Sequence, residues 1–226
     1  NMKVKIRTKI RRKWMKIRLQ PIRVFCLHHV CEQFDAKSMY PCDWMELSEF
    51  KLKIKDLDNQ GYQFISLADA YNHLKKDYFR QKKYAVLTFD DGYKSLLEVL
   101  PWLGEQNIPA TLFINGKYLD GKSFRNKNTE RYLTKKDLFS LSSLSSSLIE
   151  IGSHGWEHTD ASIMNVEMFM LNINENVSLL KEHPRYIPYH AYTWGRHNTQ
   201  TDNHLHSIQI IPVYMDGLKN YSEQNI

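Results

Sequence analysis

Two adjacent carboxylates and two histidines four residues apart are the side chains of this sequence best suited to chemistry. Asp90 and Asp91 follow one apolar run directly, and His154 and His158 come shortly after another. One carboxylate and two imidazoles can hold a divalent cation, and the second carboxylate then remains beside the metal to act as a base. A site with three protein ligands keeps an open position, which is typical of a catalytic metal.

The local context favours this interpretation over two unrelated features. An Asp-Asp-Gly tripeptide alone is equally consistent with a surface turn. Here a strand predicted over 84–89 runs directly into the acids, so we expect them at a sheet edge with little solvent. Two like charges in such a place repel each other unless a cation neutralises one of them. A strand predicted over 149–152 delivers the histidines in the same way, which favours metal ligation over a satisfied core histidine.

The elements that position these residues alternate between strand and helix, which predicts a parallel sheet or barrel. Ser48 is expected to cap one helix, and Thr134 with Asp137 to form a capping-box variant at the start of another. The polar segment 115–133 is predicted to be a loop. Predicted strands cover 24–27, 64–65, 84–89, 110–114, 149–152, 186–192 and 208–213, and predicted helices cover 48–59, 66–76, 94–106 and 165–182, with one more from 134.

The composition predicts one ordinary globular domain. The chain has 226 residues with 42% hydrophobic content, enough for one sizeable core. No run of eighteen apolar residues predicts a membrane span, and no apolar stretch resembles a signal-peptide core. The three cysteines, Cys26, Cys31 and Cys42, have no framework spacing and are expected to be buried free thiols. Four later histidines share no ligand spacing with the main site and are expected at the surface: His190, His197, His204 and His206.

The positive charge is concentrated at the start of the chain. Residues 1–23 contain ten Lys or Arg and no acid, so subtracting ten from the net charge of +6 leaves −4 for residues 24–226. We therefore predict a basic N-terminal arm over 1–23 and a mildly acidic domain over 24–226, which argues against a nucleic-acid partner. Four apolar residues of the arm share one helical face, which raises contact with a membrane surface as an alternative to a solvated tail or an extended strand: Ile6, Ile10, Trp14 and Ile17.

At the level of motifs, the sequence resembles the polysaccharide deacetylases of carbohydrate esterase family four. Thr88–Gly92 (Thr-Phe-Asp-Asp-Gly) matches the first motif of that family. Ser153–His158 matches the second motif, with Gly155 where many members have Ser or Thr. Ile108–Ile114 resembles the strand that follows the first motif, and the resemblance extends over residues 24–217.

The resemblance implies an α/β fold, a distorted (β/α) barrel of about seven parallel strands, and a role for each motif residue. Asp91, His154 and His158 would hold a divalent metal, most often zinc, although such donors also accept cobalt or nickel. Asp90 would take a proton from the metal-bound water. The backbone N–H of Trp194 would stabilise the developing oxyanion.

The proton donor is expected near the start of the chain. Phe25–Val30 resembles the start of the deacetylases that act on poly-N-acetylglucosamine. In those relatives the barrel is circularly permuted, and the histidine that acts as general acid precedes the other motifs in the sequence. The resemblance therefore implies His28 as general acid, with His29 as the second candidate and Leu27 in place of the usual tyrosine. For His29, a buried structural role is the alternative.

The third family motif is altered in this chain. Ala191–Arg196 (Ala-Tyr-Thr-Trp-Gly-Arg) stands where relatives have Ala-Tyr-Pro-Tyr-Gly, and Arg185–Tyr189 is a rival match with shifted spacing. We favour the first because the residues after it continue the pattern. Trp156, Tyr192 and Trp194 are candidates for apolar walls that stack on sugar rings, and core packing is their alternative role.

Together these features predict a metal-dependent deacetylase that hydrolyses the N-acetyl groups of an amino-sugar glycan. One alternative is a deacylase that removes another acyl group from a sugar or a small amide. The other is a catalytically idle relative that binds a glycan or a membrane, which the altered third motif would permit.

Overall fold

The chain is described by a computed structural model over residues 22–35, 39, 41–75, 82–122, 130–141, 148–215 and 224–225. Nearly all of the basic arm predicted over 1–23 lies outside these ranges, together with the helical face and the membrane contact predicted for it. No helix of the described ranges is both long enough and apolar enough to cross a bilayer.

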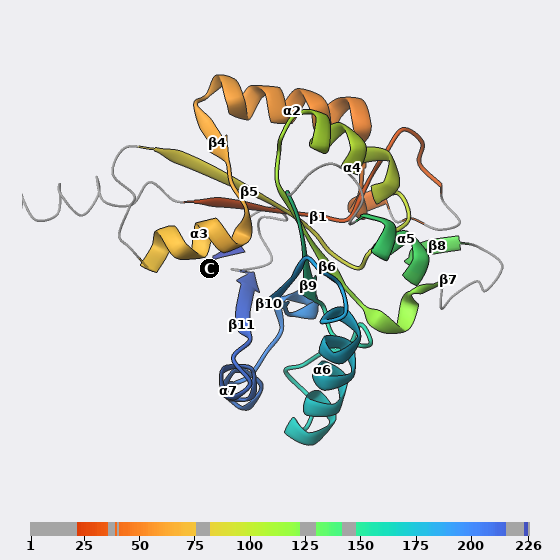
Figure 1. Ribbon diagram of the computed structural model, residues 1–226, viewed down its shortest axis with the longest axis vertical. Coiled ribbons are helices and arrows are strands. Elements are labelled where there is room, and N and C mark those ends of the chain that lie inside the picture. The colour runs from red at the N-terminus through yellow and green to blue at the C-terminus, as the bar shows by residue number, and fades with distance from the viewer. Residues whose placement is uncertain are drawn as a thin grey trace, which may run out of the picture.

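One curled sheet forms the centre of the fold (Figure 1). In the described residues seven strands pair in parallel, and β12 runs antiparallel to β11. In Figure 1, β1 and β5 run roughly horizontally whereas β11 runs roughly vertically, and this change of strand direction shows the curl of the sheet. The predicted α/β barrel of parallel strands is therefore confirmed. The order is β1 (Arg23–Leu27), β5 (Lys83–Phe89), β6 (Ala110–Ile114), β9 (Ile149–Ser153), β10 (Tyr186–Ala191), β11 (Ile211–Met215) and β12 (Gln224–Asn225), with β4 (Tyr62–Phe64) also paired to β5.

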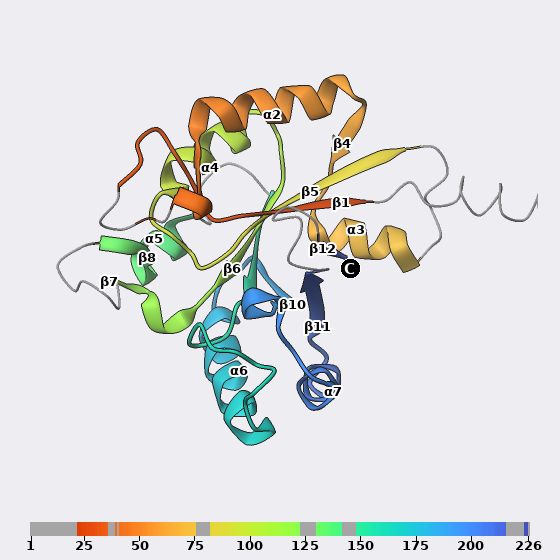
Figure 2. The same ribbon diagram turned by 180° about the vertical axis from the view of Figure 1, so that it is seen from behind.

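Helices pack on one side of the curled sheet, and on the other side the side chains of several strands pack against one another and against one helix. Both sides of the strands are therefore buried, which explains why the inner strands are continuous apolar runs. Side chains alternate along β5: Leu87 and Phe89 pack toward one cluster of the core, and Val86 packs toward the other. Figure 2 shows α2 and α4 at one end of the molecule and α6 and α7 at the opposite end. The helices are α2 (Leu47–Asn59), α3 (Leu67–Lys75), α4 (Leu96–Glu105), α5 (Lys135–Ser140), α6 (Val166–Leu180) and α7 (Thr199–Ser207).

Two smaller sheets were not predicted. β2 (His29–Cys31) pairs with β3 (Trp44–Glu46), and β7 (Asp120–Lys122) pairs with β8 (Glu130–Thr134). The prediction of a loop over 115–133 is therefore wrong in part, because a ribbon of this kind is held by backbone hydrogen bonds that polar residues permit. Short 3-10 turns lie at Pro41–Asp43, Gly116–Tyr118 and Thr193–Gly195.

The helix starts test the predicted caps. The Thr134 and Asp137 capping box at α5 is confirmed, since each side chain bonds the backbone N–H of the other residue. The predicted cap at Ser48 is wrong, because α2 begins at Leu47 and the Ser48 hydroxyl donates to the Glu46 carboxylate at 2.6 Å. Helix α7 was missed because its short segment has only a weak apolar stripe.

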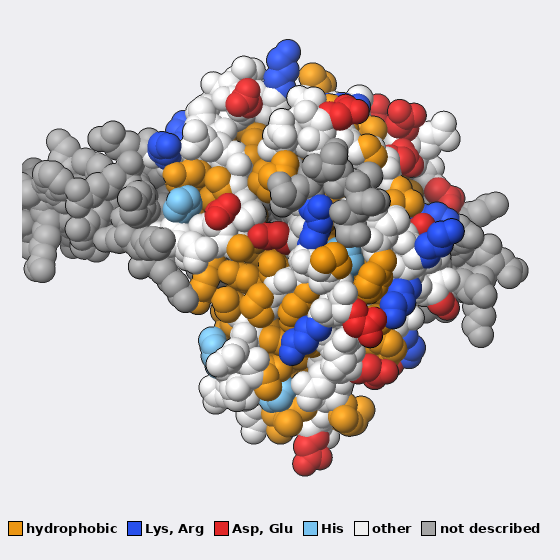
Figure 3. Space-filling model, in the orientation of Figure 1, with side chains coloured by type: hydrophobic (Ala, Val, Ile, Leu, Met, Phe, Trp, Pro, Cys, Tyr) orange, Lys and Arg blue, Asp and Glu red, His pale blue; other side chains and the backbone are white. Residues whose placement is uncertain are grey.

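Several single-residue expectations also meet the structure. Cys26 and Cys31 are buried free thiols as predicted, whereas Cys42 is free but exposed. The surface placement of His190 and His204 is wrong, because both are buried against the ring of Phe169. On the face drawn in Figure 3, hydrophobic side chains gather over the region of β10 and β11, and charges of both signs are scattered around them.

Candidate metal centre

The two acids lie in a tight turn at the carboxyl end of the central strand β5. The backbone N–H of Asp90 donates to the carbonyl of Leu27 at 2.9 Å, which continues the pairing of β5 with β1. Asp91 has φ 69° and Gly92 has φ 73°, so two successive residues adopt the left-handed region. A non-glycine residue rarely adopts this conformation, and such strain concentrates at functional sites. At Gly92 a Cβ would also lie 2.8 Å from the side chain of Ile114, so glycine is required there.

The two histidines follow β9, which lies two strands away from β5. Nδ1 of His154 lies 2.8 Å from the carbonyl oxygen of Ala191, and a carbonyl can only accept, so Nδ1 carries the proton. Nε2 of His154 is therefore left with its lone pair. Asn115 donates to the carbonyls of His154 at 2.7 Å and Gly155 at 3.1 Å, which holds the loop in place. Such partners behind a ligand orient it toward a metal.

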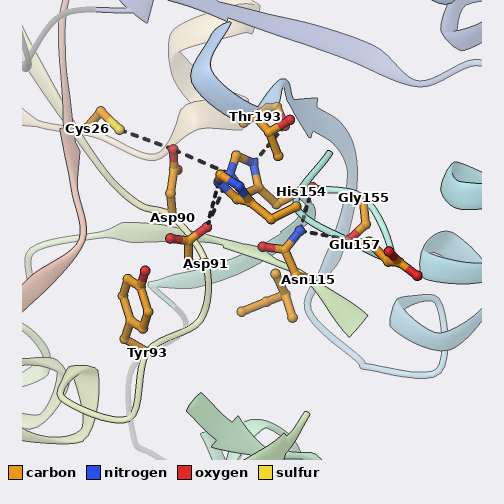
Figure 4. A network of polar contacts seen from close by, with 12 residues as sticks. Cys26, Asp90, Asp91, Tyr93, Asn115, His154, Gly155, Glu157 and Thr193 are labelled. Atoms are coloured by element: carbon orange, nitrogen blue, oxygen red, sulfur yellow. Dashed lines mark hydrogen bonds and ion pairs between the residues drawn. The ribbon is translucent and has the colours of Figure 1, made fainter. Parts of the chain in front are cut away.

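Donor atoms of Asp91, His154 and His158 lie within 4.8 Å of one another, and Figure 4 shows the side chains of Asp91 and His154 pointing toward each other. Oδ1 of Asp91 lies 3.5 Å from Nε2 of His154 and 3.4 Å from Nε2 of His158. Ligands of a tetrahedral zinc lie about 3.3 Å apart when each bond is about 2.05 Å. The Asp91 oxygen is buried and has no hydrogen-bond partner. An unpartnered oxygen facing imidazole nitrogens at ligand spacing fits a divalent cation.

The electrostatics of the cluster agree with this fit. Burial would raise the pKa of Asp91, but the facing rings of His158 and His154 outweigh burial and lower that pKa. Burial lowers the pKa of His158, which favours the neutral ring that can bind a metal. The two shifts favour the ionised carboxylate of Asp91 and the neutral ring of His158, which are the forms that bind a metal.

Asp90 lies beside the three donors and is nine-tenths buried, with 6% of its surface exposed. Its Oδ2 lies 4.0 Å from Nε2 of His154 and accepts a hydrogen bond from the Cys26 thiol at 3.2 Å (Figure 4). Its Oδ1 is buried without a hydrogen-bond partner. Asp90 therefore has a free oxygen close to the point where the ligand atoms meet. The contact with Cys26 was not predicted, because it depends on the pairing of Cys26 with Thr88 in the sheet.

The two N-terminal histidines have different surroundings. A donor nitrogen of His28 lies within 4.8 Å of donor atoms of Asp90 and Cys26. His29 is instead buried, stacks on the ring of Tyr93 at 3.8 Å and has Nδ1 3.0 Å from the Ser95 hydroxyl. Burial lowers the pKa of His29 to about 3. Of the two, only His28 adjoins the carboxylate that could act as a base.

The altered third motif, Ala191–Arg196, lies next to the ligands. The backbone carbonyl of Ala191 accepts a hydrogen bond from Nδ1 of His154, and the ring of Trp194 meets the ring of His158 edge-on with 4.5 Å between the ring centroids. Trp194 has φ 54° and is 52% exposed. The rival match, Arg185–Tyr189, spans the beginning of β10, away from the carboxyl end that carries Ala191. The geometry therefore agrees with the first of the two alignments.

The expected sugar-stacking role of Tyr192 is wrong. Its ring is 3% exposed and stacks on Phe169 and His197, and its hydroxyl donates to Asp202 at 2.9 Å. Packing by α6 and α7 leaves no free face for a sugar. The ring of Trp156 is half-buried and lies where a Cβ on Gly116 would be, so part of it is used in packing.

Two further residues near the site were not singled out from the sequence. Tyr93 is buried, and Arg131 donates to the Tyr93 hydroxyl at 3.0 Å. The guanidinium of Arg131 also lies over the Tyr93 ring, 4.8 Å from its centroid. Burial and the Asp91 charge raise the pKa of Tyr93, so the hydroxyl stays protonated and available to Asp91. The position of Tyr93, two residues after Asp91, was the available signal.

The sequence of this chain is similar to that of a curated bacterial protein. A curated relative, the putative polysaccharide deacetylase YxkH of Bacillus subtilis strain 168, is 24% identical over 155 residues, which are 68% of this chain and 52% of that protein. The chain thus spans about half the length of this relative.

Solved structures share the fold at low identity. The Streptococcus pyogenes deacetylase PplD, solved with acetate, has a TM-score of 0.68 at 19% identity, covering 84% of this chain and 80% of its own. IcaB of Ammonifex degensii has a TM-score of 0.68 at 20% identity, covering 85% and 82%. The BpsB deacetylase domain of Bordetella bronchiseptica has a TM-score of 0.64 at 17% identity, covering 86% and 88%.

The family comparison covers the proposed ligands. The family model for polysaccharide deacetylase matches residues 78–212, a span that includes both acids, both ligand histidines and Trp194. Because this span is more than half of the sequence, the chain belongs to the polysaccharide deacetylase family.

Proposed function

We propose that this chain is a metal-dependent hydrolase that removes N-acetyl groups from an amino-sugar glycan. The observation that carries the proposal is the Asp91 oxygen at 3.4 and 3.5 Å from two imidazole nitrogens, with Asp90 beside it. Family membership and the names of two of the similar structures, the PplD deacetylase and the BpsB deacetylase domain, support the reaction.

Asp91, His154 and His158 would hold the metal through the three atoms that meet at the centre. Zinc suits this donor set, and cobalt and nickel are also compatible with it. When bound, the cation supplies a Lewis acid for the amide carbonyl and lowers the pKa of a water toward neutrality. Tyr93, whose hydroxyl Arg131 holds, would remain a neutral neighbour of the Asp91 carboxylate.

Asp90 would act as the general base. Its carboxylate has one oxygen without a partner and is buried, so it can accept a proton from the attacking water in a place with little competing solvent. The Cys26 thiol donates to the other oxygen at 3.2 Å and so fixes the direction of the carboxylate. General-base assistance of this kind contributes roughly 10²–10⁴ in rate.

His28 would act as the general acid, because an amine leaves only after it gains a proton. The ring adjoins Asp90 and is half-buried, so one side remains open to a substrate. The backbone N–H of Trp194 would stabilise negative charge that develops on the carbonyl oxygen. The exposed ring of Trp194 and the open part of Trp156 would contact the sugar.

Acetate release from N-acetylglucosamine oligomers, measured together with metal content, tests the proposal. Asp90→Asn should lower the release of acetate by roughly 10²–10⁴ with the metal retained. Asp91→Asn should lose the metal as well. The matched control is Asp58→Asn, an exposed acid at the end of α2, which should change neither quantity.

The outcomes separate the proposal from its alternatives. Release of formate or another acid, without acetate, would assign the same site to a different acyl group. Bound metal with no release from any acylated sugar would overturn the hydrolase and favour an idle binding relative. Full activity in Asp90→Asn would refute the assignment of the base.

A further inference from the structure

A second group of metal-type donors lies beside the proposed ligand set. The Cys26 sulfur, a ring nitrogen of His28 and a carboxylate oxygen of Asp90 all lie within 4.8 Å of one another. Cys26 and His28 are two residues apart at the end of an extended strand, so their side chains point to the same side. The pairing of β1 with β5 places Leu27 opposite Phe89, which brings Asp90 next to both.

The spacing of this group is close to what a cation requires. In a tetrahedral zinc site, with bonds of about 2.3 Å to sulfur and about 2.05 Å to oxygen, the two donor atoms lie roughly 3.5 Å apart. The Cys26 sulfur and Oδ2 of Asp90 are already 3.2 Å apart. Cys26 and Asp90 are buried, whereas His28 is half-buried and so part of this group is in contact with solvent.

An independent observation indicates that this group lacks a ligand. Asp90 is 6% exposed, and its Oδ1 has no hydrogen-bond partner. A buried carboxylate oxygen without a partner is costly, since burial removes the water that would otherwise solvate it. The thiol satisfies only the other oxygen of the same carboxylate.

Charge and donor type decide which cation fits. The carboxylates of Asp90 and Asp91 balance the charge of the cation proposed for the first site. A second divalent cation beside it would add two positive charges, and only exchange of the Cys26 thiol proton for the cation reduces this excess to one. The proton leaves to solvent. Thiolate is a soft ligand that Mg²⁺ and Ca²⁺ avoid and that Zn²⁺ and Cd²⁺ accept.

We propose that Cys26, His28 and Asp90 form a second site for a thiophilic divalent cation, Zn²⁺ in excess or Cd²⁺, and that its occupation inhibits the enzyme. The inhibition rests on the proposed function, because the second cation would occupy the base and the acid together. The binding itself does not rest on it.

Titration of the purified protein with Cd²⁺ tests the proposal. A Cys42→Ser background removes the exposed thiol, which could bind the ion at the surface. The readouts are the number of Cd²⁺ bound and the ultraviolet charge-transfer band of a Cd²⁺–thiolate bond. Cys26→Ser is the test variant. Cys31→Ser is its matched control, since Cys31 is also buried but donates to the carbonyl of Gln33 at 3.3 Å.

The proposal expects a second bound Cd²⁺ with the band in the background protein and in Cys31→Ser. Cys26→Ser should lose the band and the second ion while retaining the first. The Cd²⁺ concentration that halves acetate release should rise by at least about tenfold in Cys26→Ser. Mutation of a residue that only hydrogen-bonds to a metal ligand already weakens metal binding by about that factor, and Cys26 would be a ligand itself. Near-ultraviolet circular dichroism of Cys26→Ser checks that its fold is retained, and Cys26→Ala provides a second variant.

Two results would overturn the proposal: a band that persists in Cys26→Ser, or a background protein that binds no second ion. If the Cys26 thiol served only as a hydrogen-bond donor to Asp90, the background protein would bind no second ion. Failure of the proposed function is distinguishable, since it would appear as loss of the first ion or of acetate release. The thiolate band would then remain and would still report on Cys26.

Discussion

Asn176 offers a direct test of how the carboxyl ends of β6 and β9 are held together. This side chain of α6 is 0% exposed. Its amide nitrogen donates to the carbonyl of Ile114 at 2.8 Å and to the hydroxyl of Ser153 at 2.9 Å, and its amide oxygen accepts from the N–H of Gly116 at 2.8 Å. Ser153 directly precedes the proposed ligand His154, so this amide supports the metal centre from behind.

We predict that Asn176→Ala lowers the free energy of unfolding by roughly 1–3 kcal/mol. The change removes the amide partner of the buried Gly116 N–H, and a buried group left unpaired costs roughly 1–3 kcal/mol. The Ile114 carbonyl adds little, because it still accepts the backbone N–H of His154 at 3.0 Å. Ser153 adds little, because its hydroxyl also contacts the N–H of Gly155 and Nδ1 of His190, both at 3.2 Å. A loss of this size is a large fraction of the roughly 5–15 kcal/mol that stabilises a typical domain.

Urea unfolding followed by tryptophan fluorescence measures this difference. The matched control is Asn174→Ala, an exposed asparagine on the same helix, which should change the free energy of unfolding by no more than about 0.5 kcal/mol. If Asn176→Ala were within about 0.5 kcal/mol of Asn174→Ala, the idea that this amide ties the two strand ends together would be refuted.

Three further predictions concern the backbone, pH and the metal. Gly155→Ala should be more destabilising than Gly61→Ala in urea unfolding, since both have φ above 80° but only at Gly155 would a Cβ lie 2.6 Å from Asn172; equal losses would contradict this. Burial lowers the pKa of His190 to about 3, so the unfolded chain binds more protons between pH 6.5 and about 3, and stability should fall as pH falls through this window. His190→Gln should make that fall shallower, and an unchanged slope would argue against it. Chelation should lower the free energy of unfolding by about 2.7 kcal/mol relative to free metal at one hundred times its Kd, and Asp91→Asn should abolish this difference; a difference that remains would place the metal elsewhere.

The close approach of Asp91, His154 and His158 could be predicted from the sequence because it depends on short-range order. Asp91 and His154 each come within two residues of the end of an apolar run, and parallel strands bring their carboxyl ends to the same edge. The prediction of a parallel barrel relied on the same alternation of strands and helices. Local hydrogen bonding at Thr134 was predictable for the same reason.

The contacts that were missed depend on pairs distant in sequence. Cys26 meets Asp90 across 64 positions, and nothing near either residue indicates the contact. Tyr192 resembles a sugar platform until Phe169 of α6 and Asp202 of α7 are seen to enclose it. Aromatic rings and histidines are ambiguous in sequence because their exposure is decided by packing. The wrong prediction that His190 lies at the surface has the same cause.

The position of β1 at the side of β5 has an evolutionary consequence. The span that matches the family model, residues 78–212, carries all three ligands proposed for the first metal site, whereas Cys26 lies in the preceding strand β1 and His28 directly follows it. A lineage could therefore replace this single strand and so change the proton donor, or gain or lose sensitivity to toxic metals, without altering the inherited ligands. The N-terminal strand would act as an interchangeable cassette that diversifies the chemistry of an otherwise constant centre.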